Sequence, residues 1–96
     1  MADDPNLFDQ FEQWYANCRD NDALDHKTKA LIGIAVVLIG NCEPCTQRRI
    51  TGAKRAGATD AEIDATLAWT MAIRAGMVQS LYRRAERTVK ETHVHG

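Results

Sequence analysis

The sequence predicts an all-α domain of five or six helices over residues 1–96. Two observations indicate this fold class. Apolar residues recur at helical spacing in successive segments, and capping residues and glycines separate those segments. A third observation argues against a sheet, because the β-branched run IAVVLI has no turn signal before it and no second run to pair with. A chain of 96 residues supports one domain with a thin core.

The first helix is expected within the acidic segment 1–22. Asp4 is suited to the N-cap and Pro5 to the first helical turn, where proline's missing N–H has no consequence. The apolar stripe of this helix ends at Cys18, which is therefore expected to be a buried core thiol. The rest of the stripe consists of Leu7, Phe8, Phe11, Trp14 and Tyr15.

The second helix is expected to follow Asp25, its N-cap, and to hold the apolar run from Ala30 to Gly40. This run is shorter than the roughly 20 residues that span a bilayer, so no membrane contact is expected. From Leu31 to Ile39 the helix is apolar on nearly every side, and a thin core cannot cover all of it. We therefore expect part of this helix to lie in an interface between subunits.

Capping residues also define the next helices. Asn41 is the expected N-cap of a third helix that ends near Ala56, and Gly57 is suited to the left-handed conformation that closes many helices. Thr59 and Glu62 have the spacing of a capping box and so predict the start of a fourth helix.

The last part of the chain is expected to contain a break and a frayed end. Gly76 is expected to interrupt the helical pattern because glycine is a poor helix former. The segment 91–96 is expected to fray. With these interruptions the helices number five or six.

Charge and composition narrow the function. The net charge is −1, but residues 1–26 sum to −6 and residues 27–96 to +5. The bases alternate with acids and small residues without an aromatic platform, so we exclude nucleic acid as a partner. The acidic start MADDPN does not resemble a signal peptide, and three cysteines do not form a paired framework. The expected location is the cytoplasm, where thiols stay reduced.

The stretch NCEPCTQRR holds the most informative residues, Cys42 and Cys45. With Asn41 as the cap, both cysteines fall in the first turn of a helix, where the dipole and unpaired N–H groups favour a thiolate. A thiol pKa there falls from about 8.5 toward about 7. Arg49 shares that helix face and adds positive charge. The pair is therefore suited to thiol–disulfide exchange, although two small residues in a helical turn remain an alternative.

A metal site is the other chemistry that two cysteines suggest. Zinc would need two more ligands, and the candidates are His26, His93, His95 and Cys18. None lies at a standard spacing from the pair. We therefore expect neither a metal nor another cofactor.

The segments DHKTKALIGIAVVLIGNCEPC and AGATDAEI, in this order, resemble the carboxymuconolactone decarboxylase and alkyl hydroperoxidase D superfamily, over roughly Leu24 to Gly76. The resemblance implies an all-helical subunit that assembles through its core helices into trimers or hexamers. It also implies an oxidoreductase that reduces small peroxides or disulfides and receives electrons from a thiol donor. By the family's assignment, Cys45 attacks and Cys42 resolves the intermediate, whereas the helix-start argument favours Cys42. We side with the family because Arg49 lies one turn from Cys45 and can steady its thiolate.

The chain departs from the redox branch of this superfamily at two positions. That branch has a glutamate on the helix before the cysteines and a histidine one turn after the second cysteine, and together they relay a proton. Here these positions hold Ala30 and Arg49. Arginine stays protonated, so it cannot relay a proton. Glu43 is the nearest acid that could substitute, although acids are common at helix starts.

Two other functions are compatible with this sequence. The loss of the proton relay favours a non-catalytic oligomeric binding protein. A decarboxylase acting on a small carboxylate, held by Arg48, Arg49 or Arg74, would lack an obvious general base.

Overall fold

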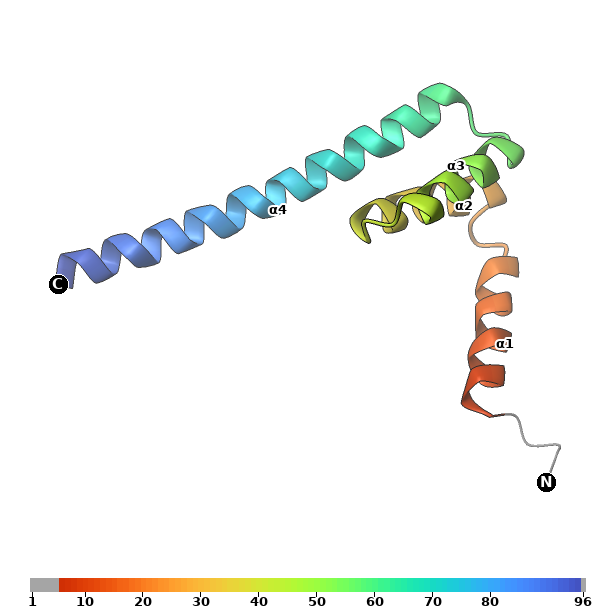
Figure 1. Ribbon diagram of the computed structural model, residues 1–96, viewed down its shortest axis with the longest axis horizontal. Coiled ribbons are helices and arrows are strands. Elements are labelled where there is room, and N and C mark those ends of the chain that lie inside the picture. Colours follow the sequence, from red (N-terminus) through yellow and green to blue (C-terminus); the bar gives the residue numbers. More distant parts are fainter. Residues whose placement is uncertain (1–5, 96) are drawn as a thin grey trace.

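The computed structural model describes residues 6–95 and contains four helices and no strand within that range (Figure 1). The all-α class is confirmed, and the expected count of five or six helices is wrong. The helices are α1 (Leu7–Asp20), α2 (His26–Ile39), α3 (Glu43–Arg55) and α4 (Asp60–His95).

The count differs because α4 passes through Gly76 without a break. One glycine in a helix interior costs only about 1 kcal/mol, and good helix formers continue on both sides. The helix also includes residues 91–95 of the segment that was expected to fray. The side chains of residues 93–95 lie outside the description.

Capping residues fix the starts of the first two helices. The N–H of Asp9 donates to Asn6 Oδ1 at 2.9 Å, so Asn6 caps α1. The expected cap at Asp4 and the proline after it lie outside the described residues. The predicted cap of α2 is confirmed, because the N–H of Thr28 donates to Asp25 Oδ1 at 2.7 Å.

A tight reversal joins α2 to α3, which lie side by side (Figure 1). Asn41 has a φ of 57°, in the left-handed region, and its N–H donates to Leu38 O at 3.1 Å. Asparagine tolerates this conformation better than most residues, so it completes the end of α2. The N-cap of α3 is therefore Cys42, and the prediction that Asn41 would cap this helix is wrong.

The connection from α3 to α4 follows the sequence prediction. Gly57 has a φ of 92°, and the N–H of Ala58 donates back to Ala53 O at 2.9 Å. The capping box is also present, since Thr59 N–H donates to Glu62 Oε1 at 2.8 Å and Glu62 N–H donates to Thr59 Oγ1 at 3.1 Å. These contacts set the direction in which α4 leaves the α2–α3 pair.

The core is confined to the place where α2, α3 and the start of α4 meet. Among the described residues, the buried apolar side chains are Ile34, Ala53 and Ala58. Partly buried neighbours pack around them: Ala30, Leu31, Leu38, Ile50 and Ile63. An ion pair of 2.9 Å between Lys27 and Glu62 further joins α2 to α4. This core holds α2 and α3 in place but covers only a small part of the chain.

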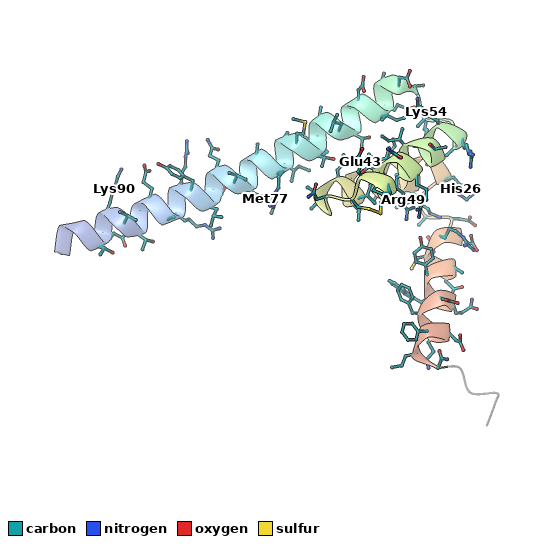
Figure 2. All side chains as sticks on the ribbon, viewed as in Figure 1. His26, Glu43, Arg49, Lys54, Met77 and Lys90 are labelled. Carbon is teal, nitrogen blue, oxygen red and sulfur yellow. A yellow bond between two sulfur atoms is a disulfide. The ribbon has the colours of Figure 1, made fainter. Side chains whose placement is uncertain are left out.

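The rest of α4 and most of α1 extend away from this core (Figures 1 and 2). The radius of gyration is 20.0 Å, whereas a compact chain of this length has one of about 12.5 Å. On α4, Trp69 is 67% exposed and Leu81 is 63% exposed. Cys18 on α1 is free and exposed, so the prediction of a core thiol is wrong. Its stripe has helical periodicity, but no other helix of the same chain covers it.

No helix among the described residues combines the length and the apolar character needed to cross a membrane.

Candidate functional site

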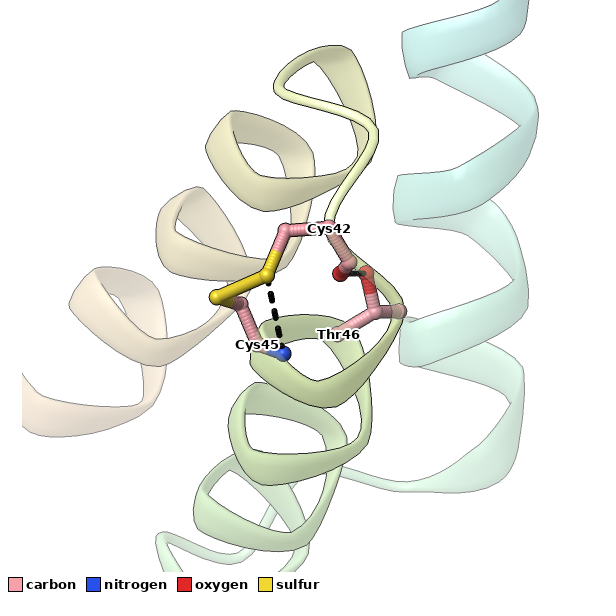
Figure 3. Close-up of a disulfide and its surroundings, with 3 residues drawn as sticks. All are labelled: Cys42, Cys45 and Thr46. Atoms are coloured by element: carbon pink, nitrogen blue, oxygen red, sulfur yellow. Dashed lines mark hydrogen bonds between the residues drawn. A yellow bond between two sulfur atoms is a disulfide. The ribbon is translucent and has the colours of Figure 1, made fainter.

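Cys42 and Cys45 form a disulfide at the start of α3 (Figure 3). Their Cα atoms lie 5.3 Å apart, and both residues are half-buried. As the N-cap, Cys42 accepts a hydrogen bond on its Sγ from the N–H of Cys45 at 3.3 Å. The hydroxyl of Thr46 donates to Cys42 O at 2.7 Å and fixes the same turn.

This arrangement favours a negative charge on the sulfur of Cys42. An N-cap atom lies where helix N–H groups are unpaired and where the positive end of the helix dipole is strongest. When the disulfide is reduced, the Cys45 N–H is placed to donate to a Cys42 thiolate. The exposed Glu43 follows in the first turn of α3, where its charge also complements the dipole.

Arg49 extends from α3 across α2 toward α1. Its path crosses Gly33, because a Cβ at that glycine would lie 3.1 Å from Arg49 Cδ. The guanidinium then comes close to the Tyr15 hydroxyl, where its capacity to donate a hydrogen bond and its positive charge lower the pKa of the Tyr15 phenol. The structure therefore joins Arg49 to Tyr15, a contact that the sequence did not predict.

An open cleft of about 830 Å³ surrounds this contact. Ala30 of α2 and Gly52 of α3 contribute small residues to its lining. The other lining residues are Tyr15, Arg19, His26, Lys29, Arg48, Arg49, Arg55 and Ala56. Six of these side chains are basic and none is acidic, so we refer to this site as the basic cleft.

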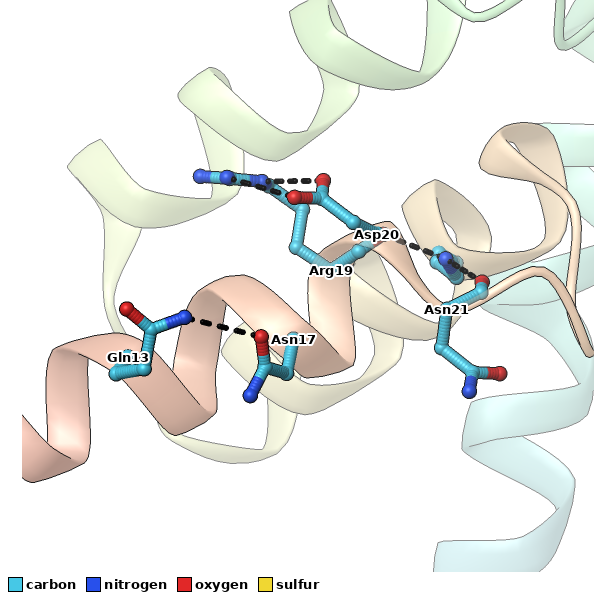
Figure 4. A network of polar contacts seen from close by, with 6 residues as sticks. Gln13, Asn17, Arg19, Asp20 and Asn21 are labelled. Carbon is cyan, nitrogen blue, oxygen red and sulfur yellow. Dashed lines mark hydrogen bonds and ion pairs between the residues drawn. The ribbon is translucent and has the colours of Figure 1, made fainter.

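Some of the basic groups already have partners. Arg19 pairs with Asp20 at 3.0 Å (Figure 4). The ammonium of Lys29 donates to Arg19 O at 2.5 Å and also to Asn21 O, so it closes the C-terminal end of α1. By contrast, no carboxylate among the described residues lies within 4.0 Å of Arg48, Arg49 or Arg55.

The structure brings together some of the predicted site residues and separates others. Arg49, Arg48 and Ala30 line the basic cleft, as does His26. Arg74 lines a different cleft, on α4. His93 and His95 have side chains outside the described part of the chain. Among the described residues, no three histidine, cysteine or acidic side chains gather as metal ligands would.

The sequence alone did not predict that these basic residues form one cleft. Arg48 and Arg55 are seven residues apart on α3, a spacing that places both on one helix face. This spacing could have predicted a basic face on α3. The contributions of Lys29 from α2 and Tyr15 from α1 depend on how the helices pack, and no local pattern predicts them.

We expect the change Arg49→Gln to raise the pKa of Tyr15 toward its ordinary value. The guanidinium stabilises the phenolate, so its removal leaves the neutral phenol favoured to higher pH. Phenolate absorbance during an alkaline titration measures the shift, and the change Tyr82→Phe in the same background leaves one tyrosine and assigns the signal. An unchanged Tyr15 titration in the glutamine variant would contradict the contact.

Comparison with known proteins places the chain in a family. A model of the carboxymuconolactone decarboxylase family matches residues 5–85. The chain belongs to the carboxymuconolactone decarboxylase family. This membership agrees with the all-helical fold and with the resemblance seen in the sequence.

Two known proteins are similar to this chain in sequence or in fold. "Uncharacterized protein 4 in cox locus" of Paracoccus denitrificans is 33% identical over 69 residues, which are 72% of this chain and 62% of that protein. The crystal structure of a Methanobacterium thermoautotrophicum protein, a structural genomics target, has a TM-score of 0.73 and 26% identity, and the match covers 86% of this chain and 95% of the other. The chain therefore shares its fold with a solved protein and spans under two thirds of its curated relative.

Proposed function

We propose that the protein is a thiol–disulfide oxidoreductase that exchanges electrons through Cys42 and Cys45. The observation that carries this proposal is the cysteine pair at the start of α3, bonded and half-buried, with one sulfur as the N-cap. The helix start stabilises the thiolate that exchange requires. In a reducing compartment such as the cytoplasm, a thiol donor would return the disulfide to two thiols.

The exchange reaction proceeds in two displacements. A Cys42 thiolate attacks one sulfur of a substrate disulfide, forms a mixed disulfide and releases the first substrate thiolate. Cys45 then loses its proton and attacks Cys42 Sγ, which closes the internal disulfide and releases the second thiolate. The substrate gains two electrons, and both of its halves leave as thiols after protonation.

Ala30 and Arg49 favour a disulfide over a peroxide as the substrate. A thiolate leaves without help because thiols have a pKa of about 8.5. Peroxide cleavage releases an alkoxide or hydroxide, whose conjugate acids have a pKa far above that of a thiol. That step needs a proton donor, and the relay positions hold a methyl group and a permanently charged guanidinium.

The N-cap geometry supports Cys42 as the attacking cysteine, opposite to the order that the family resemblance implies. Cys42 receives the Cys45 N–H, while Arg49 extends to Tyr15. We expect the Cys45→Ser variant, which keeps Cys42, to accumulate a mixed disulfide with a small disulfide at least about tenfold faster than Cys42→Ser. Mass spectrometry over time gives both rates.

The Cys18→Ser change is included in both variants so that the free exposed thiol adds no signal. Faster trapping by Cys42→Ser would restore Cys45 as the attacker. If neither variant forms a mixed disulfide, the exchange mechanism is wrong.

We further propose that the protein acts as a homo-oligomer. Apolar side chains remain exposed along α1 and along α4 beyond the core, and these surfaces resemble interface surfaces more than those of a monomer. A trimer or hexamer is the expected assembly. The exposed residues on the outer part of α4 include Met77, Val78, Leu81 and Tyr82.

The basic cleft supports a second candidate, a non-catalytic oligomeric protein that binds a small anion. Such a protein would keep its ligand when both cysteines are changed to serine. A decarboxylase is a further candidate; no carboxylate lines the cleft in the described part of the chain, so His26 would have to act as its general base.

A further inference from the structure

Three arginines in the basic cleft lack a carboxylate partner. Arg48, Arg49 and Arg55 all line the cleft, and the described residues place no carboxylate within 4.0 Å of them. Other cations of the same region do pair, such as Lys54 with Asp60 at 3.7 Å. The cleft is therefore a local excess of positive charge that no acidic side chain within residues 6–92 neutralises.

The shape of the cleft suits a small molecule. Its volume of about 830 Å³ lies within the range of small-molecule sites. Its small lining residues, Ala30 and Gly52, leave room between α2 and α3. A glutamate at the position of Ala30 would place a negative charge in this space. Because alanine stands there instead, the charged side chains among the described lining residues are all basic.

The cleft begins one turn from the cysteine pair. Along α3, Cys45, Arg49 and Gly52 are separated by four and then three residues, so they follow one helix face. With a rise of about 1.5 Å per residue, the Cα atoms of Cys45 and Arg49 are about 6 Å apart along the helix axis. Neither cysteine lines the cleft itself. Arg48 is three residues from Cys45 and six from Cys42, about 4.5 and 9 Å along the axis, and an arginine side chain together with a small disulfide can span that distance.

We propose that the basic cleft binds the carboxylates of the substrate, so that the Cys42–Cys45 pair reacts with anionic disulfides in preference to neutral or cationic ones. This inference rests on the proposed exchange function and names its substrate class. A thiolate repels an anionic disulfide, and the guanidinium group of Arg48, one to two turns from the cysteine pair, would offset that repulsion while it orients a carboxylate. The bonds made and broken are those of the exchange described above.

The test compares three small disulfides of different charge: dithiodipropionate, bis(hydroxyethyl) disulfide and cystamine. Each oxidises the fully reduced Cys18→Ser protein, and loss of free thiols gives the rate. We expect dithiodipropionate to react about tenfold faster than the neutral compound and cystamine to react more slowly. Arg48→Gln should lower the rate with dithiodipropionate about fivefold and leave the neutral compound unaffected.

The matched control is Arg87→Gln, which removes an equal charge from the outer part of α4 and should change none of the rates. High ionic strength should remove most of the preference, since salt screens exposed charges. Equal rates for the three compounds, or equal effects of Arg48→Gln and Arg87→Gln, would overturn the inference and leave the exchange function intact.

A binding measurement distinguishes a failure of the exchange function from a failure of the cleft to bind an anionic substrate. Calorimetry with dithiodipropionate and the Cys18→Ser/Cys42→Ser/Cys45→Ser variant reports binding to the cleft without the reaction. Binding without any exchange by the parent protein would overturn the exchange function and support the anion-binding alternative. Neither binding nor exchange would overturn both proposals.

Discussion

The Cys18→Ser/Cys42→Ser/Cys45→Ser variant is expected to lose all thiol–disulfide exchange, so that a small disulfide is consumed no faster than in the absence of protein. The two sulfur atoms hold the electrons that are exchanged, and serine hydroxyls cannot form the mixed disulfide. The fold should remain, because serine is a good N-cap and replaces Cys42 in that role. Release of substrate thiol measures activity, and far-ultraviolet circular dichroism measures helix content.

The control for this experiment is Cys18→Ser. Cys18 is exposed and lies on α1, away from the bonded pair, so its removal should leave the exchange rate unchanged. A strong loss of activity in this variant, or persistent exchange in the triple serine variant, would refute the assignment of the site.

The Leu81→Asp variant is expected to dissociate the proposed oligomer. Leu81 is 63% exposed on the part of α4 that extends beyond the core. Burial of a leucine contributes about 1.5–3 kcal/mol, and an unpaired carboxylate in its place adds a desolvation penalty. Since about 1.4 kcal/mol is a tenfold change, the concentration for half-assembly should rise at least about a hundredfold. Light scattering or sedimentation gives the mass.

Gln79→Asp is the matched control for charge, because Gln79 lies two positions away and therefore on a different face of α4. It should assemble like the parent protein. A parent protein that is monomeric at micromolar concentration would contradict the assembly proposal directly. Loss of helix content on dissociation of Leu81→Asp would show that α4 depends on its neighbours in the oligomer.

Local signals in the sequence predicted most of the helix boundaries. The cap at Asp25, the left-handed Gly57 and the Thr59–Glu62 capping box all depend on contacts within a few residues, and all three are confirmed. Gly76 was misread because its local penalty is smaller than the stabilisation from the helix around it.

Predictions that depended on tertiary contacts succeeded less well. The apolar stripe of α1 was taken to imply burial, yet Cys18 is exposed, because periodicity reports a face and not what covers it. The cysteine pair was found from the sequence, whereas the basic cleft requires Tyr15, Lys29 and Arg49 from three separate helices. Only their packing shows that these residues meet.

The covalent link between Cys42 and Cys45 encloses a span of just three peptide bonds. Cross-links stabilise a protein in proportion to the chain freedom that they remove from its denatured form, and a loop this short removes less than longer ones do. The stability of the native fold therefore depends only weakly on whether this disulfide is formed. The surrounding scaffold is therefore expected to persist when this bond opens and closes, which the proposed electron exchange requires.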